Sequence, residues 1–163
     1  MKKKKTDSPH SLDYRSAVIQ LPLVRDSPHG FVRTPEDVEN LCSDLRDLAQ
    51  EVFLVLVLDT RNRLLNRALV SVGILDSALV HCREVFRSSI VLGGAAVILV
   101  HGHPSGDPTP SAEDVKLTRQ MVQAGEIIGI RVLDHIIIGR KSENNKGYLS
   151  MRESGVVEFD GKP

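Results

Sequence analysis

Three short apolar runs constrain the fold more than any other feature of this sequence. Residues 51–60 read EVFLVLVLDT, residues 95–103 read AAVILVHGH and residues 130–139 read IRVLDHIIIG. Each run has the length of a strand and is nearly continuous, which is typical of a strand that is buried on both faces. The sequence therefore predicts an α/β fold in which helices sandwich a mixed β-sheet.

Helical periodicity and capping residues predict the elements between these strands. Thr34 caps a helix whose apolar stripe runs to Leu48, and Gly93 follows the last residue of a second helix. The second helix is expected at 82–92, a third at 112 to about 123, and further strands at 16–24, 64–73, 77–80 and 148–151. We expect one domain over residues 34–158, a partly irregular N-terminal extension over 1–33 and a short tail over 159–163.

The charge and cysteine content exclude several classes of protein. Lys+Arg and Asp+Glu both number 21, so the net charge is zero and nothing attracts the chain to nucleic acid or to an anionic membrane. Two cysteines are too few for a disulfide scaffold. No stretch is long and apolar enough for a membrane helix or a signal peptide. We therefore expect a cytoplasmic protein that makes no contact with membranes.

His101 and His103 stand at the end of the second apolar run. Side chains alternate along a strand, so both imidazoles are expected to point the same way, as two ligands of one metal ion do. The ordinary alternative is that one histidine finishes the strand while the other belongs to the following loop.

Ser111 and Asp114 follow at the start of the third helix, where S-x-x-D is also a common capping pattern. Asp114 shares a helix face with Leu117, Thr118 and Met121, which is expected to turn toward the sheet. A buried carboxylate needs a partner, and a metal ion on the two histidines would supply it. Two imidazoles and one carboxylate suit a catalytic zinc site with an open position, although iron oxygenases use the same ligand set.

The spacing His101-x-His103-x7-Ser111-x2-Asp114, together with HCREVF at 81–86 and LDHIIIG at 133–139, resembles the bacterial RadC family of JAMM (JAB1/MPN+) domain proteins. The resemblance covers residues 34 to about 155. It implies the cytidine-deaminase-like MPN (JAMM) fold for the domain, a Zn²⁺ ion held by His101, His103 and Asp114, and Ser111 beside the metal-bound water.

Three departures from the family pattern stand out. Gly102 occupies the position between the histidines where family members usually carry Asn. Residues 1–33 show no counterpart of the family's helix-hairpin-helix region, and the polar loop after Gly139 is longer than usual. We expect the first departure to affect the loop rather than metal binding, because that Asn is not a ligand.

A metal-activated water also needs a base, and the family resemblance indicates Glu51 at the start of the first buried strand. Glu51 could otherwise be a charged residue that merely bounds the strand. Glu84 is the second candidate, although the dipole of the second helix also explains an acid there. Asp134 and His135 belong to a strand expected beside the metal strand, where either could support the site or be an ordinary buried group.

Two functions remain as hypotheses. The first is a zinc-dependent metallopeptidase or isopeptidase that acts on a protein or peptide, with Glu51 as base and Ser111 steadying the oxyanion. The second is a metal-stabilised module associated with DNA repair that has no hydrolytic activity. The neutral charge argues against direct binding of nucleic acid by this chain alone, and the sequence allows a homodimer.

Overall fold

A single five-stranded sheet forms the centre of the part of the chain that the computed structural model describes, residues 30–73, 80–143 and 145–159. The strands run in the order β2-β1-β3-β4-β5. Their bounds are β1 Val52–Leu58, β2 Leu64–Val72, β3 Ala96–Gly102, β4 Arg131–Ile138 and β5 Tyr148–Ser150. Strands β3 and β4 are parallel and the other neighbouring pairs are antiparallel, so the predicted mixed sheet is confirmed.

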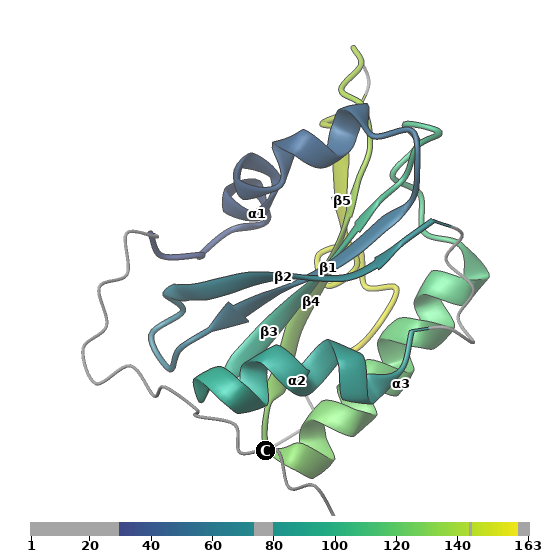
Figure 1. Cartoon of the computed structure of the whole chain (residues 1–163). Coiled ribbons are helices and arrows are strands. Elements are labelled where there is room, and N and C mark those ends of the chain that lie inside the picture. Colours follow the sequence, from purple (N-terminus) through teal and green to yellow (C-terminus); the bar gives the residue numbers. More distant parts are fainter. Residues whose placement is uncertain (1–29, 74–79, 144, 160–163) are drawn as a thin grey trace, which may run out of the picture.

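Helices lie on both faces of this sheet (Figure 1). Helix α1 (Pro35–Leu41) and the 3₁₀ helix η1 (Ser43–Asp47) lie on one face, and α2 (Cys82–Leu92) and α3 (Ala112–Ile128) lie on the other. All residues of β1 and β3 are buried, as expected for strands covered on both sides. The predicted α/β sandwich is therefore confirmed.

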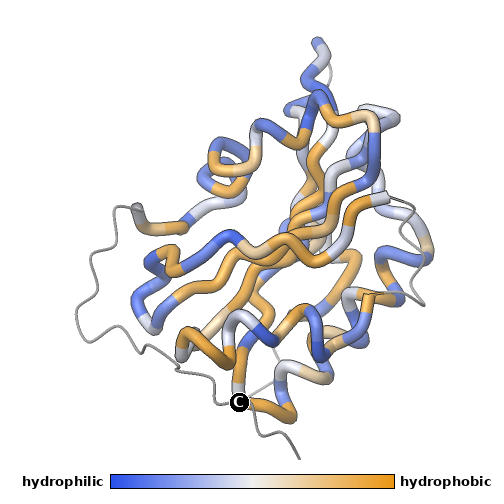
Figure 2. The backbone as a smooth tube through the Cα atoms, viewed as in Figure 1, coloured by the Kyte–Doolittle hydropathy of each residue, from blue (hydrophilic) through white to orange (hydrophobic). Residues whose placement is uncertain are grey.

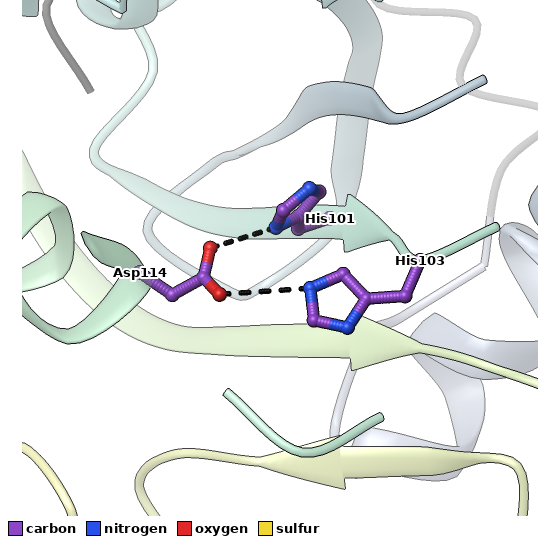
Figure 3. A group of neighbouring side chains, drawn as sticks. All are labelled: His101, His103 and Asp114. Atoms are coloured by element: carbon purple, nitrogen blue, oxygen red, sulfur yellow. Dashed lines mark hydrogen bonds and ion pairs between the residues drawn. The ribbon is translucent and has the colours of Figure 1, made fainter. Parts of the chain in front are cut away.

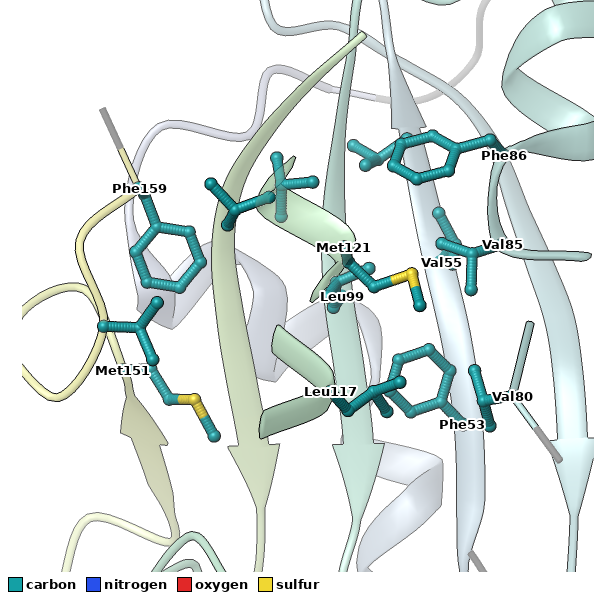
Figure 4. Packing of buried hydrophobic residues seen from close by; sticks show 14 of the residues in the cluster. Phe53, Val55, Val80, Val85, Phe86, Leu99, Leu117, Met121, Met151 and Phe159 are labelled. Atoms are coloured by element: carbon teal, nitrogen blue, oxygen red, sulfur yellow. The ribbon is translucent and has the colours of Figure 1, made fainter. Parts of the chain in front are cut away.

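Each face of the sheet carries its own apolar cluster. Phe53 and Val55 of β1 meet Leu117 and Met121 of α3 in the cluster that Figure 4 shows. The other cluster lies between the sheet and α1, and it includes the buried Leu45 of η1. In Figure 2 the hydrophobic colour follows the strands through the middle of the molecule. The sheet is thus the central layer against which both sets of helices pack.

Helix α3 is longer than predicted. It continues past the expected end near Gln123 to Ile128, and Gly129 closes it in the left-handed conformation with φ 72°. Gly125 lies inside the helix, where the chain that turns back after Gly129 passes close to it. A Cβ on Gly125 would lie 2.5 Å from the carbonyl oxygen of Ile130, so only glycine permits this approach.

Helix α1 is shorter than predicted. The capping box of Thr34 is present, but the α-helix ends at Leu41 and the chain continues as the 3₁₀ helix η1. The tighter winding keeps Leu45 in the core, while Leu48, the last residue of the predicted stripe, is 38% exposed.

Other predictions fall partly or wholly outside the described residues. The strand expected at 16–24 lies outside them, and so does the strand expected at 77–80 except for the buried Val80. Val32 and Phe159 pack into the apolar clusters next to the two ends of the predicted domain. Within the described ranges, no helix has both the length and the apolar character needed to cross a membrane.

Candidate metal centre

The two histidines and the aspartate come from adjoining elements at one end of the sheet. His101 lies on the central strand β3 opposite Phe53 of β1, and His103 follows directly after that strand. The loop after His103 leads into α3, whose third residue is Asp114. Because α3 packs on the same face that carries Phe53, its first turn brings the carboxylate to the histidines (Figure 3).

The Asp114 carboxylate contacts both imidazoles (Figure 3). Its Oδ1 lies 2.8 Å from Nδ1 of His101, and its Oδ2 lies 3.5 Å from Nε2 of His103. One nitrogen or oxygen from each of the three side chains lies within 4.8 Å of the others. His101 and Asp114 are buried and His103 is half-buried, so the group opens toward solvent on the His103 side.

The loop fixes which nitrogen of His103 faces Asp114. Nδ1 of His103 lies 2.7 Å from the carbonyl oxygen of Asp107, which can only accept, so Nδ1 carries a proton and donates it. In the neutral ring Nε2 then offers its lone pair on the Asp114 side. A backbone acceptor behind the far nitrogen is the usual support of a metal-binding histidine. The backbone carbonyl of Asp107 could not be predicted as part of the site, because such a contact does not depend on the type of side chain.

Ser111 and Asp114 form a complete capping box. The backbone N–H and the hydroxyl of Ser111 donate to Oδ2 of Asp114 over 2.8 and 2.6 Å, and the Asp114 N–H donates to the Ser111 Oγ over 3.1 Å. The capping alternative is therefore true, and it does not exclude a second role. The cap holds the carboxylate in the orientation in which it meets the histidines.

The electrostatics of the group couple its members. Burial alone would raise the pKa of Asp114, but hydrogen bonds from His101, His103 and Ser111 hold that pKa far below its usual range. Burial would lower the pKa of His103, but Asp114 and the Asp107 carbonyl outweigh it and raise that pKa. A permanently charged carboxylate at this place needs positive charge beside it, from imidazolium or from a metal ion.

The donor set fits zinc. Two imidazoles and a carboxylate are ligands that Zn²⁺ takes, and three protein ligands leave one position for water. The nitrogen of His101 that meets the Asp114 carboxylate is Nδ1, and the nitrogen of His103 that does so is Nε2. These features support the predicted ligands His101, His103 and Asp114, whose metal role stays a prediction.

The two candidate bases lie in different settings. Glu51 immediately precedes Val52, which pairs with Gly102, and the charge of Glu51 helps to raise the pKa of His103. Glu84 forms ion pairs over 3.3 Å with Arg83 and over 3.8 Å with Arg87, both on its own helix α2. The structure thus places Glu51 at the same end of the sheet as the histidines, whereas the ion pairs of Glu84 are local. The role of Glu51 as base stays a prediction.

Two residues of β4 were candidates for supporting the site, and they point to opposite faces of that strand. They are Asp134 and His135. The Asp134 carboxylate accepts from Ser150 Oγ over 2.5 Å, on the face away from α3. His135 lies opposite Leu99 on the α3 face, where it contacts Thr118. Only His135 therefore lies on the side of the candidate metal centre. Burial, helped by the charge of His101, lowers the pKa of His135 to about 3, so the ring is neutral.

The structure also shows the surroundings of His81, before α2, and of Gly102, at the end of β3. His81 occupies the N-cap position of α2, but its side chain makes no capping hydrogen bond. Gly102, found where Asn is usual, packs under η1: a Cβ there would lie 3.2 Å from the Cβ of Leu45. A larger residue would require η1 to move outward, so the glycine matches the tight packing of Leu45 on this face.

Comparison with known proteins relates this chain to one family. The model of the RadC-like JAB domain matches residues 32–156. The chain is 53% identical over 128 residues to a UPF0758 protein of Desulforamulus reducens, covering 78% of this chain and 54% of that protein. It is 47% identical over 130 residues to the UPF0758 protein YsxA of Bacillus subtilis, covering 79% of this chain and 54% of that protein. The chain thus spans about half the length of these curated relatives.

The match covers all the strands and helices described above, including both histidines and Asp114. It confirms the JAB (JAMM/MPN) type of fold that the motif implied. This chain belongs to the family of RadC-like JAB domain proteins.

Proposed function

We propose that this chain is a zinc-dependent hydrolase of peptide or isopeptide bonds. The observation that carries the proposal is the convergence of His101, His103 and Asp114, with one carboxylate oxygen toward each imidazole. The fixed Nδ1 tautomer of His103 adds to it, since it prepares Nε2 as a ligand before any metal arrives.

Each residue then has a defined task. Zn²⁺ held by His101, His103 and Asp114 would lower the pKa of water from 15.7 toward about 7 and polarise the scissile carbonyl. Glu51 accepts the proton of the attacking water and passes it to the leaving amine. Its place just before Val52, the partner of Gly102, supports this role.

Ser111 has a double task in this proposal. Its hydroxyl donates to Asp114 over 2.6 Å, so it first fixes the carboxylate. To steady an oxyanion the same hydroxyl must turn from Asp114 toward the substrate. Because Ser111 is exposed at the start of α3, it has room to make that turn.

The test is a screen for hydrolysis of quenched fluorescent peptides and isopeptide-linked substrates by the zinc-loaded chain. Glu51→Gln keeps the shape of the side chain but cannot take a proton, so we expect it to keep its zinc and lose roughly 10²–10⁴-fold in rate. Glu84→Gln is the matched control, since it removes an acid of similar exposure from α2, and it should hydrolyse nearly as wild type does.

Two outcomes would contradict the proposal or part of it. Full activity in Glu51→Gln with an inactive Glu84→Gln would transfer the base to Glu84. A wild-type chain that holds zinc, cleaves nothing and binds duplex DNA with nanomolar affinity would instead favour a DNA-associated module. With zero net charge we expect only weak binding to duplex DNA, on the order of 10⁻⁴–10⁻⁶ M or weaker at physiological salt.

A further inference from the structure

His135 is a fully buried imidazole that the proposed reaction does not use. It lies on β4, beside the strand that carries His101, and its ring faces the His101 ring at 6.3 Å between centroids. Its Nδ1 lies 2.6 Å from the Thr118 hydroxyl on α3. That hydroxyl in turn lies 2.6 Å from the backbone carbonyl of Asp114. A chain of two short contacts therefore connects β4 to the residue that carries the third candidate ligand.

The number of protons available fixes which atom donates in each of these two hydrogen bonds. The Thr118 hydroxyl has one proton, and the Asp114 carbonyl can only accept, so Thr118 donates to that carbonyl. The Met151 sulfur, at 3.4 Å from the same hydroxyl, is a weaker and more distant acceptor. The Thr118 oxygen is then free to accept, and Nδ1 of His135 must carry a proton and donate it.

The other nitrogen of His135 is left as an unprotonated, buried atom. Nε2 has no hydrogen-bond partner within the described ranges of the chain. A histidine kept only for packing would be replaced at less cost by an apolar ring, because an unpaired buried nitrogen is unfavourable. What His135 provides that an apolar ring cannot is the hydrogen bond from Nδ1 to Thr118.

We propose that His135 is a positioning residue for the metal centre. Through Thr118 it ties the first turn of α3 to β4, the strand next to β3, and so holds Asp114 at a fixed place relative to His101. The cap by Ser111 sets the direction of the carboxylate within the helix, and the tie by His135 sets the place of the helix on the sheet. This inference rests on the proposed function, since it needs a metal for the three side chains to hold.

The first experiment measures zinc affinity by competition with a chelator, with thermal unfolding of the metal-free protein recorded alongside. Thr118→Val keeps the shape but removes the hydroxyl, and His135→Phe keeps a ring but removes the donor. We expect each to weaken zinc binding roughly tenfold, the range typical of residues that support metal ligands. The double variant should bind zinc no more weakly than the weaker of the two single variants, because both changes break the same hydrogen-bonded connection between β4 and α3.

Two control variants separate positioning from stability. Thr118→Ser retains the hydroxyl and should bind zinc within about threefold of wild type. Ser150→Ala removes a buried hydroxyl that donates to Asp134 on the opposite face of the sheet. It should lower the unfolding temperature and leave zinc affinity unchanged. Equal zinc affinities for Thr118→Val, Ser150→Ala and wild type would overturn the inference while leaving the proposed function intact.

The second experiment needs no variant. Nitrogen NMR of the imidazoles in the metal-free wild-type protein at neutral pH should show His135 with its proton on Nδ1 and none on Nε2. A proton on Nε2 instead would overturn the inference, because Nδ1 could then not donate to Thr118. A wild-type chain that binds no zinc would contradict the proposed function, and the positioning role would fail with it.

Discussion

Helices α1 and α3 begin with the same local motif and differ in what lies beside it. In both, a hydroxyl residue at the N-cap accepts from the backbone N–H three residues later, and an aspartate at that position accepts from the N-cap N–H. The pairs are Thr34 with Asp37 and Ser111 with Asp114. Sequence alone gives both helices the same signature.

The surroundings make one box a cap and the other a candidate ligand. The contacts of the Asp37 carboxylate are local: it accepts from the backbone N–H groups of Arg33 and Thr34, and its pKa is lowered by these two residues alone. Asp114 is 1% exposed and also meets His101 and His103. A capping box is thus a local feature. Whether its aspartate can also serve as a metal ligand depends on which side chains of the sheet lie beside the start of the helix.

The largest expected difference between the two boxes is in zinc affinity. Asp114→Asn removes the charged ligand and should weaken zinc binding by roughly 10²-fold or more, since zinc prefers a charged oxygen donor to a neutral amide. Asp37→Asn should leave zinc affinity unchanged and cost about 0.3–1 kcal/mol of stability through the helix dipole. Chelator competition and thermal unfolding of both variants measure the two effects. Equal zinc affinity in the two variants would show that the boxes do not differ in this way.

A smaller difference is expected for the hydroxyl residues. Thr34→Ala and Ser111→Ala should each cost about 1 kcal/mol of stability, because each removes an N-cap. Ser111 also donates its proton to the Asp114 carboxylate over 2.6 Å. Ser111→Ala should therefore weaken zinc binding by roughly tenfold as well, and Thr34→Ala should not. Isothermal titration with zinc would contradict this if the two variants bound alike.

The smallest expected difference is in the pH dependence of the metal-free protein. Folding raises the pKa of His103. The stabilisation that the charged imidazole gives is therefore complete below the pKa of the unfolded state, near 6.5, and is lost as pH rises through the pKa of the folded state. The pKa of Asp114 is lowered, so its contribution is complete above about 4 and is lost as pH falls. The pair therefore stabilises the fold most between about pH 4 and 6.5.

The measurement is the unfolding temperature of wild type, Asp114→Asn and Asp37→Asn at pH 5.5 and pH 8 in the presence of a chelator. Wild type should exceed Asp114→Asn by more at pH 5.5 than at pH 8. The pKa of Asp37 is lowered by backbone hydrogen bonds, so its contribution changes only in acid and the difference for Asp37→Asn should be the same at both pH values. A constant difference for Asp114→Asn would show that His103 is not coupled to it.

Periodicity predicted the parts of this molecule that depend on local sequence. The buried strands follow from nearly continuous apolar runs, and the N-caps Thr34 and Ser111 follow from patterns that close one helical turn. Helix lengths were predicted less well. The third helix was expected to end near Gln123, but it continues to Ile128, and Gly125 within it lies close to the Ile130 carbonyl.

The support of the site depends on register and could not be predicted. Between Val97 and Ile98 the pairing of β3 with β4 shifts by one residue, and beyond this point Asp134 lies opposite Ile98 and His135 opposite Leu99. This shift decides that His135, not Asp134, faces α3. Nothing in the local sequence marks such a shift, so the contact between His135 and Thr118 appears only in the folded chain.

The zinc content of the wild-type chain, purified without chelator and then titrated with zinc, tests the metal centre most directly. We expect about one zinc ion per chain, and X-ray absorption should show nitrogen ligands at about 2.0–2.1 Å from the metal. A chain that carries no zinc as purified and takes up none on titration would show that His101, His103 and Asp114 do not form a metal centre.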